Sequence, residues 1–166
     1  RLTLQGSYVI EAKNYDQGKG TLAHANFVEV SENGTLSLEG KLTAHTSDGF
    51  FNGKYGTEGL VYCKGKMEMS NQSSVSGWTV YDTTSLESCR NAAIVLEGAK
   101  AELVMNGGEI AGNYNVGSNG VAGAAVQVRN GASFVMNDGN IHENGIIASP
   151  KANVHYGAGV FVYGEN

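Results

Sequence analysis

An internal repeat of about 33 residues constrains this chain more than any other feature of its sequence. The clearest unit is Ala125–Asn144, AVQVRNGASFVMNDGNIHEN, which has apolar residues at alternating positions. Turn residues interrupt this alternation at Asn130-Gly131 and at Asn137-Asp138-Gly139. Such a pattern predicts three short β-strands joined by tight turns.

Equivalent strands recur along the whole chain. The first strand forms a column with steps of 33, 33, 32 and 34 residues, which contains Val28, Val61, Ile94, Val126 and Val160. The second strand recurs as Leu2–Leu4, Leu36–Leu38, Met67–Met69, Leu103–Met105 and Phe134–Met136, and the third centres on Tyr8, Leu42, Val75, Ile110 and Ile141. Strands repeated at a constant offset can stack as parallel ladders about 4.8 Å apart. The sequence therefore predicts one all-β domain over residues 1–166, a right-handed parallel β-helix (solenoid) of about five coils.

The repeat also predicts where individual side chains lie. The apolar columns should fill the tube, and Glu29, Ser37, Tyr62, Glu68 and Gln127 should point outward. The pairs Asn106 with Asn137 and Asn113 with Asn144 hold equivalent turn positions, where asparagine can bond to the next coil. Cys63 lies in an interior column, which favours a buried thiol, while a disulfide with Cys89 stays open as the alternative.

Composition and charge exclude some classes of partner. The chain has 24 glycines and one proline, which fits a fold with many turns. It carries 11 basic and 16 acidic residues, a formal net charge of −5, and its basic residues are scattered. Nucleic acid is therefore not an expected partner. No apolar run reaches the roughly 18 to 20 residues that a membrane span requires, so membrane insertion is not expected either.

The segments GASFVMNDGNIHEN (Gly131–Asn144) and YGAGVFV (Tyr156–Val162) resemble the repeats of right-handed parallel β-helix proteins of the pectin-lyase-like fold. They particularly resemble the repeats found in large bacterial surface and adhesin-like proteins. This resemblance covers nearly the whole chain and is tightest from Ala92 onward. The resemblance implies a bacterial protein that is secreted or anchored to the cell surface, with its export signal outside this chain. The chain opens on a second strand and closes just after a first strand, so we expect it to be a segment of a longer solenoid.

The longest connections are expected between the third strand of one coil and the first strand of the next. They are Ala12–Asn26, Thr43–Gly59, Gly77–Asn91, Tyr114–Ala124 and Gly145–Ala158. Stacked coils would place them along one edge, which carries the candidate ligand-binding residues Phe50, Phe51, Tyr55, Trp78, Tyr81, Tyr114 and Tyr156. Exposed rings could stack on sugars or anchor a protein, with Trp78 as the favoured contact. The alternative is that these rings cover the outer face of the tube.

The sequence offers little for catalysis. A lyase of this fold would need clustered carboxylates that hold calcium, and a polygalacturonase would need closely set aspartates. Asp48 and Asp82 are weak candidates, because they lie in separate loops and neither belongs to a paired motif. The four histidines have no metal-ligand spacing, so neither a metal nor another cofactor is expected.

We therefore expect an extracellular bacterial binding or adhesion module rather than an enzyme. Its expected partner is a host or microbial glycan, or a host glycoprotein such as mucin or immunoglobulin, bound at the loop edge or on an outward strand face. A polysaccharide lyase or hydrolase and a stalk without a ligand remain alternatives. The sequence does not predict an oligomeric state.

Overall fold

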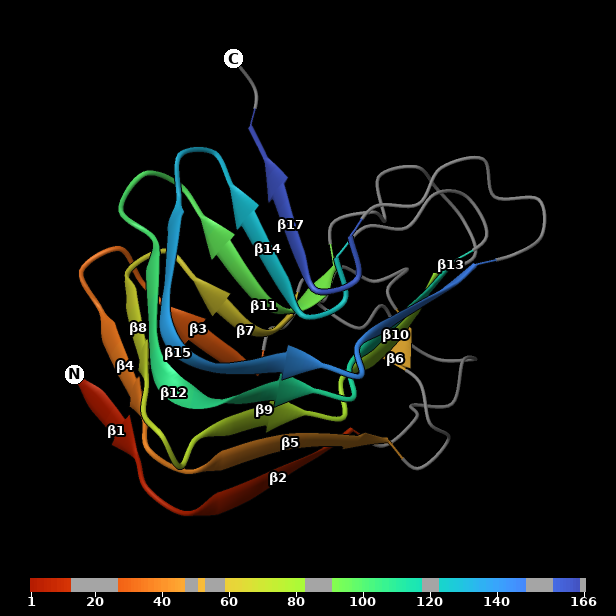
Figure 1. Cartoon of the computed structure of the whole chain (residues 1–166), viewed down its shortest axis with the longest axis horizontal. Coiled ribbons are helices and arrows are strands. Elements are labelled where there is room, and N and C mark those ends of the chain that lie inside the picture. The colour runs from red at the N-terminus through yellow and green to blue at the C-terminus, as the bar shows by residue number, and fades with distance from the viewer. Residues whose placement is uncertain are drawn as a thin grey trace, which may run out of the picture.

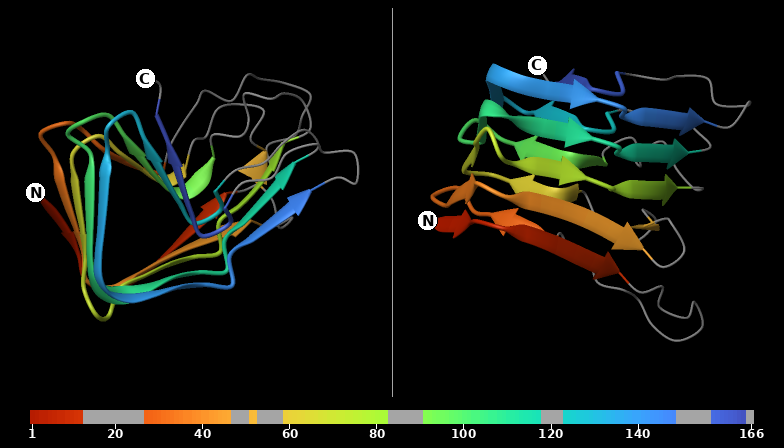
Figure 2. Two further views of the ribbon diagram at one scale, coloured as in Figure 1. Left: turned by 45° about the horizontal axis from the view of Figure 1, so that its top comes forward. Right: turned by 60° about the horizontal axis from the view of Figure 1, so that its bottom comes forward.

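The computed structural model describes residues 1–12, 27–46, 51–52, 59–82, 91–117, 123–148 and 157–164. Within these ranges the regular elements are all β-strands, and every strand pairing is parallel. The strands form three sheets that wind around one core (Figure 1). The coils follow one another from the N-terminal strands to the C-terminal strands (Figure 2, right). The chain is thus a parallel β-helix, as the repeat predicted.

The first predicted column is confirmed in a five-stranded sheet. Its strands are β3 (Val28–Val30), β7 (Gly59–Cys63), β11 (Ala92–Glu97), β14 (Val126–Arg129) and β17 (Val160–Tyr163). Val28 pairs with Val61, Val61 with Ile94, Ile94 with Val126, and Val126 with Val160. Like residues in one column therefore lie directly above one another.

The second and third predicted columns share one bent, eight-stranded sheet. Its strands are β1 (Leu2–Leu4), β2 (Ser7–Ala12), β4 (Thr35–Leu38), β5 (Lys41–Thr46), β8 (Lys66–Met69), β9 (Ser74–Ser76), β12 (Glu102–Ala111) and β15 (Ser133–His142). In the coils that contain β12 and β15, one long strand replaces the predicted second strand, turn and third strand. The register shifts around Asn106 mark where β12 bends while its ladder with β15 continues.

A third sheet corrects the prediction of long loops. It contains β6 (Phe51–Asn52), β10 (Thr79–Asp82), β13 (Tyr114–Gly117) and β16 (Gly145–Ala148). All four strands lie inside segments that were predicted to be connections. These segments have weak alternation, so parallel pairing with the coils above and below supplies the order that the local sequence does not specify.

The coils differ in how completely they are formed. Three of them, β7 to β10, β11 to β13 and β14 to β16, contribute strands of three or more residues to every sheet. The preceding coil contributes only the two-residue β6 to the third sheet. The stack thus amounts to about three full turns, fewer than the five coils predicted, although the first column runs through five strands.

The core lies inside the tube, where the inward columns meet. Leu36, Met67 and Leu103 of one column are completely buried, as are Val61, Ile94 and Val126 of another. The outward prediction holds for Glu29 and Glu68, which are exposed, whereas Ser37 and Gln127 are buried. All four residues of β14 are buried, so the sheet is covered on both faces at this strand.

Candidate functional site

Trp78, the favoured contact residue, lies in the core with no exposed surface. Its ring meets the ring of Phe27 edge-on, with 6.2 Å between the centroids. The register that pairs Thr79 with Tyr114 and Tyr114 with Gly145 also places Trp78 in the column of Asn113 and Asn144. Trp78 therefore packs inside the tube rather than on an exposed loop.

The residue before Trp78 belongs to a turn that recurs in successive coils, and its glycine is a signal in the sequence that could have located Trp78. Gly77, Gly112 and Glu143 precede Trp78, Asn113 and Asn144, and their φ values are 75°, 66° and 54°. Positive φ favours glycine, and it turns the chain at the same place in these three successive coils. Aligning Gly77-Trp78 with Gly112-Asn113 places Trp78 in this turn rather than in an exposed loop.

The other predicted contact residues are not gathered into one site. Tyr114 is half-buried, and its ring leaves no room for a Cβ on its strand partner Gly145, since that atom would lie 2.7 Å from Tyr114 Cδ1. Phe51 and Tyr81 lie in strands of the third sheet, paired with Val80 and Asn52 respectively. Phe50, Tyr55 and Tyr156 lie outside the described residues, so the aromatic loop edge stays a prediction.

The catalytic candidates are not brought together within the described part of the chain. Asp82 ends β10 and pairs with Gly117, whereas Asp48 lies outside the described residues. No group of three or more His, Cys, Asp or Glu side chains able to hold a metal ion occurs among the described residues. Cys63 is a buried thiol, and burial raises its pKa to about 11. Its suggested partner Cys89 is not among the described residues.

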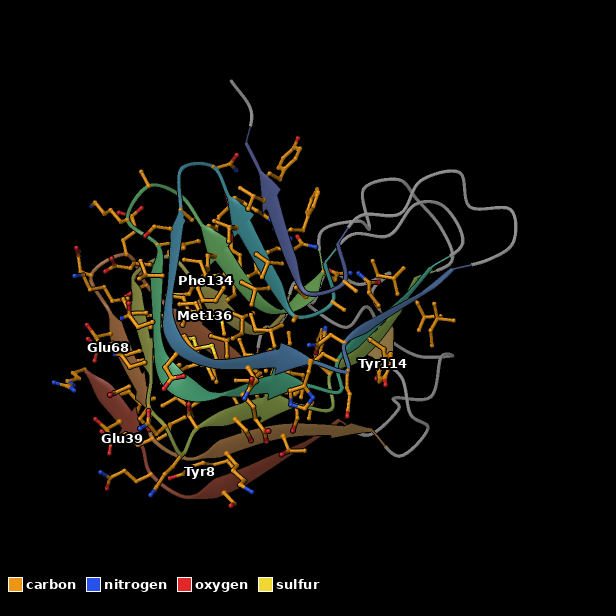
Figure 3. All side chains as sticks on the ribbon, viewed as in Figure 1. Tyr8, Glu39, Glu68, Tyr114, Phe134 and Met136 are labelled. Atoms are coloured by element: carbon orange, nitrogen blue, oxygen red, sulfur yellow. The ribbon has the colours of Figure 1, made fainter. Side chains whose placement is uncertain are left out.

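A polar groove crosses the bend of the eight-stranded sheet on its outer face. This bend groove is open to solvent and has a volume of about 730 Å³, and its lining includes Arg1, Gln5, Glu39, Glu68, Asn71, Gln72 and Asn106. Glu39 and Glu68 project outward from the bend, on the side away from Tyr114 (Figure 3). The sheet therefore presents carboxylate and amide groups from successive coils in one recess.

Close backbone contacts form this bend. Glu39 N donates to Leu4 O at 2.9 Å, and Lys41 N donates to Gly6 O at 2.6 Å. The two coils approach so closely that a Cβ on Gly40 would collide with the backbone of Gly6. In the next coil, Ser73 donates from its backbone N at 3.0 Å and from its Oγ at 2.7 Å to Ser70 O, which fixes the turn that carries Asn71 and Gln72.

A second recess shares Asn71 and Gln72 with the bend groove. It encloses about 430 Å³, and its lining includes Lys41, Glu109, Asp138 and Asn140. Asn106 and Asn137 lie along the same bend, where Asn137 Nδ2 donates to Asn106 Oδ1 at 2.7 Å. This amide pair confirms the predicted ladder, although the strand partner of Asn106 is Asp138 rather than Asn137.

The sequence interpretation missed the bend groove because it searched the long connections for function. A polar column was nevertheless visible directly after the second strand, at Gln5, Glu39, Ser70 and Asn106. Of these residues, only Asn106 was interpreted from the sequence, as a turn residue. What the sequence could not supply is the bend itself, which aligns these turns on one surface.

A buried polar network lies at the other side of the core. Arg129 is 4% exposed, and its Nε and Nη2 donate to Gln127 Oε1 at 2.9 and 2.6 Å. Arg129 Nη1 is 3.5 Å from Glu97 Oε2, and these two residues are strand partners. Gln127 Nε2 and Asn115 Nδ2 both donate to Asn91 O, at 3.1 and 2.9 Å. Because these groups are satisfied inside the fold, the network serves packing rather than ligand binding.

Comparison with known proteins yields no match to a family model, a curated protein or a solved structure. The fold itself defines the class, an all-β parallel solenoid. The likeness to pectin-lyase-like and adhesin repeats rests on the sequence pattern alone. No helix among the described residues is long and apolar enough to span a membrane.

Proposed function

We propose that this protein is an extracellular glycan-binding module of the adhesin kind, which binds its ligand in the bend groove. The ligand is a host or microbial glycan, either free or carried on a glycoprotein. The bend groove is the observation that carries the proposal. The extracellular and bacterial setting rests on the resemblance of the repeats.

The chemistry of the groove suits a ligand rich in hydroxyl groups. Asn71, Gln72 and Asn106 are exposed, and each amide offers both donors and acceptors. Glu68 adds acceptor oxygens, with 48% of its side chain exposed. Coils repeat about every 4.8 Å, so an extended glycan along the stack would meet polar groups at regular intervals. No aromatic side chain is among the described residues that line the groove, so hydrogen bonding would dominate recognition.

Replacing Asn71 and Gln72 together by alanine tests the proposal. Both side chains are exposed, so the fold should survive while the groove loses two amides. We expect affinity for the glycan identified on an array to fall by about tenfold, since each lost hydrogen bond contributes about 0.5 to 1.5 kcal/mol. Isothermal titration calorimetry measures the change.

A matched control removes an exposed pair elsewhere on the stack. Lys100 and Glu32 form an exposed ion pair at 3.0 Å, and neither residue is among the described residues that line the bend groove. The Glu32→Ala, Lys100→Ala variant should bind like the original protein. Equal losses in the two variants would refute binding at the bend, and no binding to any glycan or glycoprotein would favour the stalk alternative.

A further inference from the structure

We propose that the bend groove selects glycans that are neutral or carry amino groups, and that it discriminates against polyanionic glycans such as polymers of uronic acids or sulfated sugars. This inference rests on the proposed function, because it specifies the ligand class of the same groove. Two observations support it: the charges of the residues that line the groove, and the contacts of Arg1 with Glu68 and Ser37.

Carboxylates outnumber basic groups along the bend. Among the described residues that line the groove, Glu39 and Glu68 are acidic and Arg1 is basic. In the adjoining recess, the described lining contains the acidic residues Glu109 and Asp138 and the basic residue Lys41. Four carboxylates against two basic groups give a formal local charge of 2 − 4 = −2. Charges of one sign in a recess raise the local concentration of opposite charges and lower that of like charges.

The guanidinium of Arg1, which could bind an anionic ligand, already has partners within the fold. Its Nη2 lies 3.9 Å from Glu68 Oε2 and donates to Ser37 Oγ at 3.4 Å. An incoming carboxylate or sulfate would have to compete with Glu68 for the guanidinium while lying near Glu39. Both effects oppose the binding of an anion.

The described surface offers no alternative basic cluster near the groove. Lys64, Lys66 and Lys100 each lie within 3.9 Å of a glutamate oxygen, from Glu29, Glu102 and Glu32 respectively. The exposed amides of Asn71, Gln72 and Asn106 remain suited to hydroxyl and acetamido groups. An amino group on the sugar would gain a charge-assisted hydrogen bond to a carboxylate.

Three oligosaccharide probes of matched length test the inference: oligomers of N-acetylglucosamine, of glucosamine and of glucuronic acid. At low ionic strength, the neutral and cationic oligomers should bind at least about tenfold more tightly than the anionic one. The difference should shrink at 0.5 M salt, because ions screen exposed charges over a few ångströms. Calorimetric titration at low ionic strength and at 0.5 M salt measures the three affinities.

A charge-matched pair of variants separates the groove from the whole molecule. Glu39→Gln with Glu68→Gln and Glu29→Gln with Glu32→Gln each change the formal net charge from −5 to −3. In the first variant, the ratio of the affinity for the neutral or cationic oligomer to that for the anionic oligomer should fall about threefold or more. In the second variant, this ratio should stay nearly unchanged. An equal fall of this affinity ratio in both variants would overturn the inference.

The two proposals fail in distinguishable ways. If the anionic oligomer binds best and the Asn71→Ala, Gln72→Ala variant weakens it, the groove is a glycan site and the proposed selectivity is wrong. If no probe and no array glycan binds, the proposed function itself is wrong.

Discussion

At the scale of single residues, the solenoid depends on an asparagine that it buries completely. Asn113 Oδ1 accepts from Trp78 N at 3.0 Å, and its Nδ2 donates to Val75 O at 3.2 Å and to Asn144 Oδ1 at 2.9 Å. It therefore links three successive coils. The predicted asparagine ladder exists here because the amide offers both donors and acceptors in one turn.

Replacing Asn113 by alanine should lower the free energy of unfolding by about 2 to 3 kcal/mol, since it strands buried backbone groups without partners. Urea denaturation followed by circular dichroism measures the loss. Asn137→Ala is the control, because this exposed ladder member should cost less than about 0.5 kcal/mol. Similar losses at the two positions would contradict the structural role given to Asn113.

At the scale of elements, the bend between β4 and β5 depends on the absence of a side chain at Gly40. A Cβ there would collide with the backbone of Gly6 in the preceding coil. Backbone atoms cannot move aside as a flexible side chain would, so the coils must separate or the bend must open. The bend groove lies on the same turn, so its geometry depends on this close approach.

Gly40→Ala should therefore lower the free energy of unfolding by about 2 to 3 kcal/mol and weaken glycan binding as well. Gly159→Ala is the matched control, because its Cβ would meet Ile141 Cγ2 at 3.6 Å, an ordinary contact. Urea denaturation of both variants tests the difference. A Gly40→Ala protein as stable as the control would show that the bend tolerates a wider spacing.

At the scale of the whole molecule, burial is set by the coils on either side rather than by residue type. Met105 and Met136 are strand partners in one column, yet Met105 is fully buried and Met136 is 44% exposed. Figure 3 shows Met136 beside Phe134 on β15, which pairs with β12 on one side. A methionine side chain should therefore contribute more to the free energy of unfolding at position 105 than at position 136.

Met105→Ala should destabilise the protein by about 2 to 5 kcal/mol, the range for a fully buried large side chain. Met136→Ala should cost roughly half of that or less, because much of its surface already contacts water. Urea denaturation compares this matched pair of substitutions. Equal costs would mean that Met136 is covered in solution by something outside the described contacts.

The repeat in the sequence predicted most of the stack. All three columns are confirmed residue by residue, because alternation and a constant offset leave few other ways to bury Val61, Leu36 or Ile110. The third sheet was missed, because β10 and β13 have little alternation of their own and gain their order from neighbouring coils. The position of Trp78 was missed because its turn was not aligned with those of Asn113 and Asn144.

Only the tertiary structure decided which polar residues share a surface. The sequence by itself determined that Ala125–Asn144 is one rung of a parallel stack, because its inward residues cannot be buried by a single coil. It did not determine that Gln5, Glu39 and Asn71 meet in one groove, because that depends on the bend of the sheet and the close contact at Gly40. Repetition specifies the stacking, whereas the bend specifies the surface on which a ligand could bind.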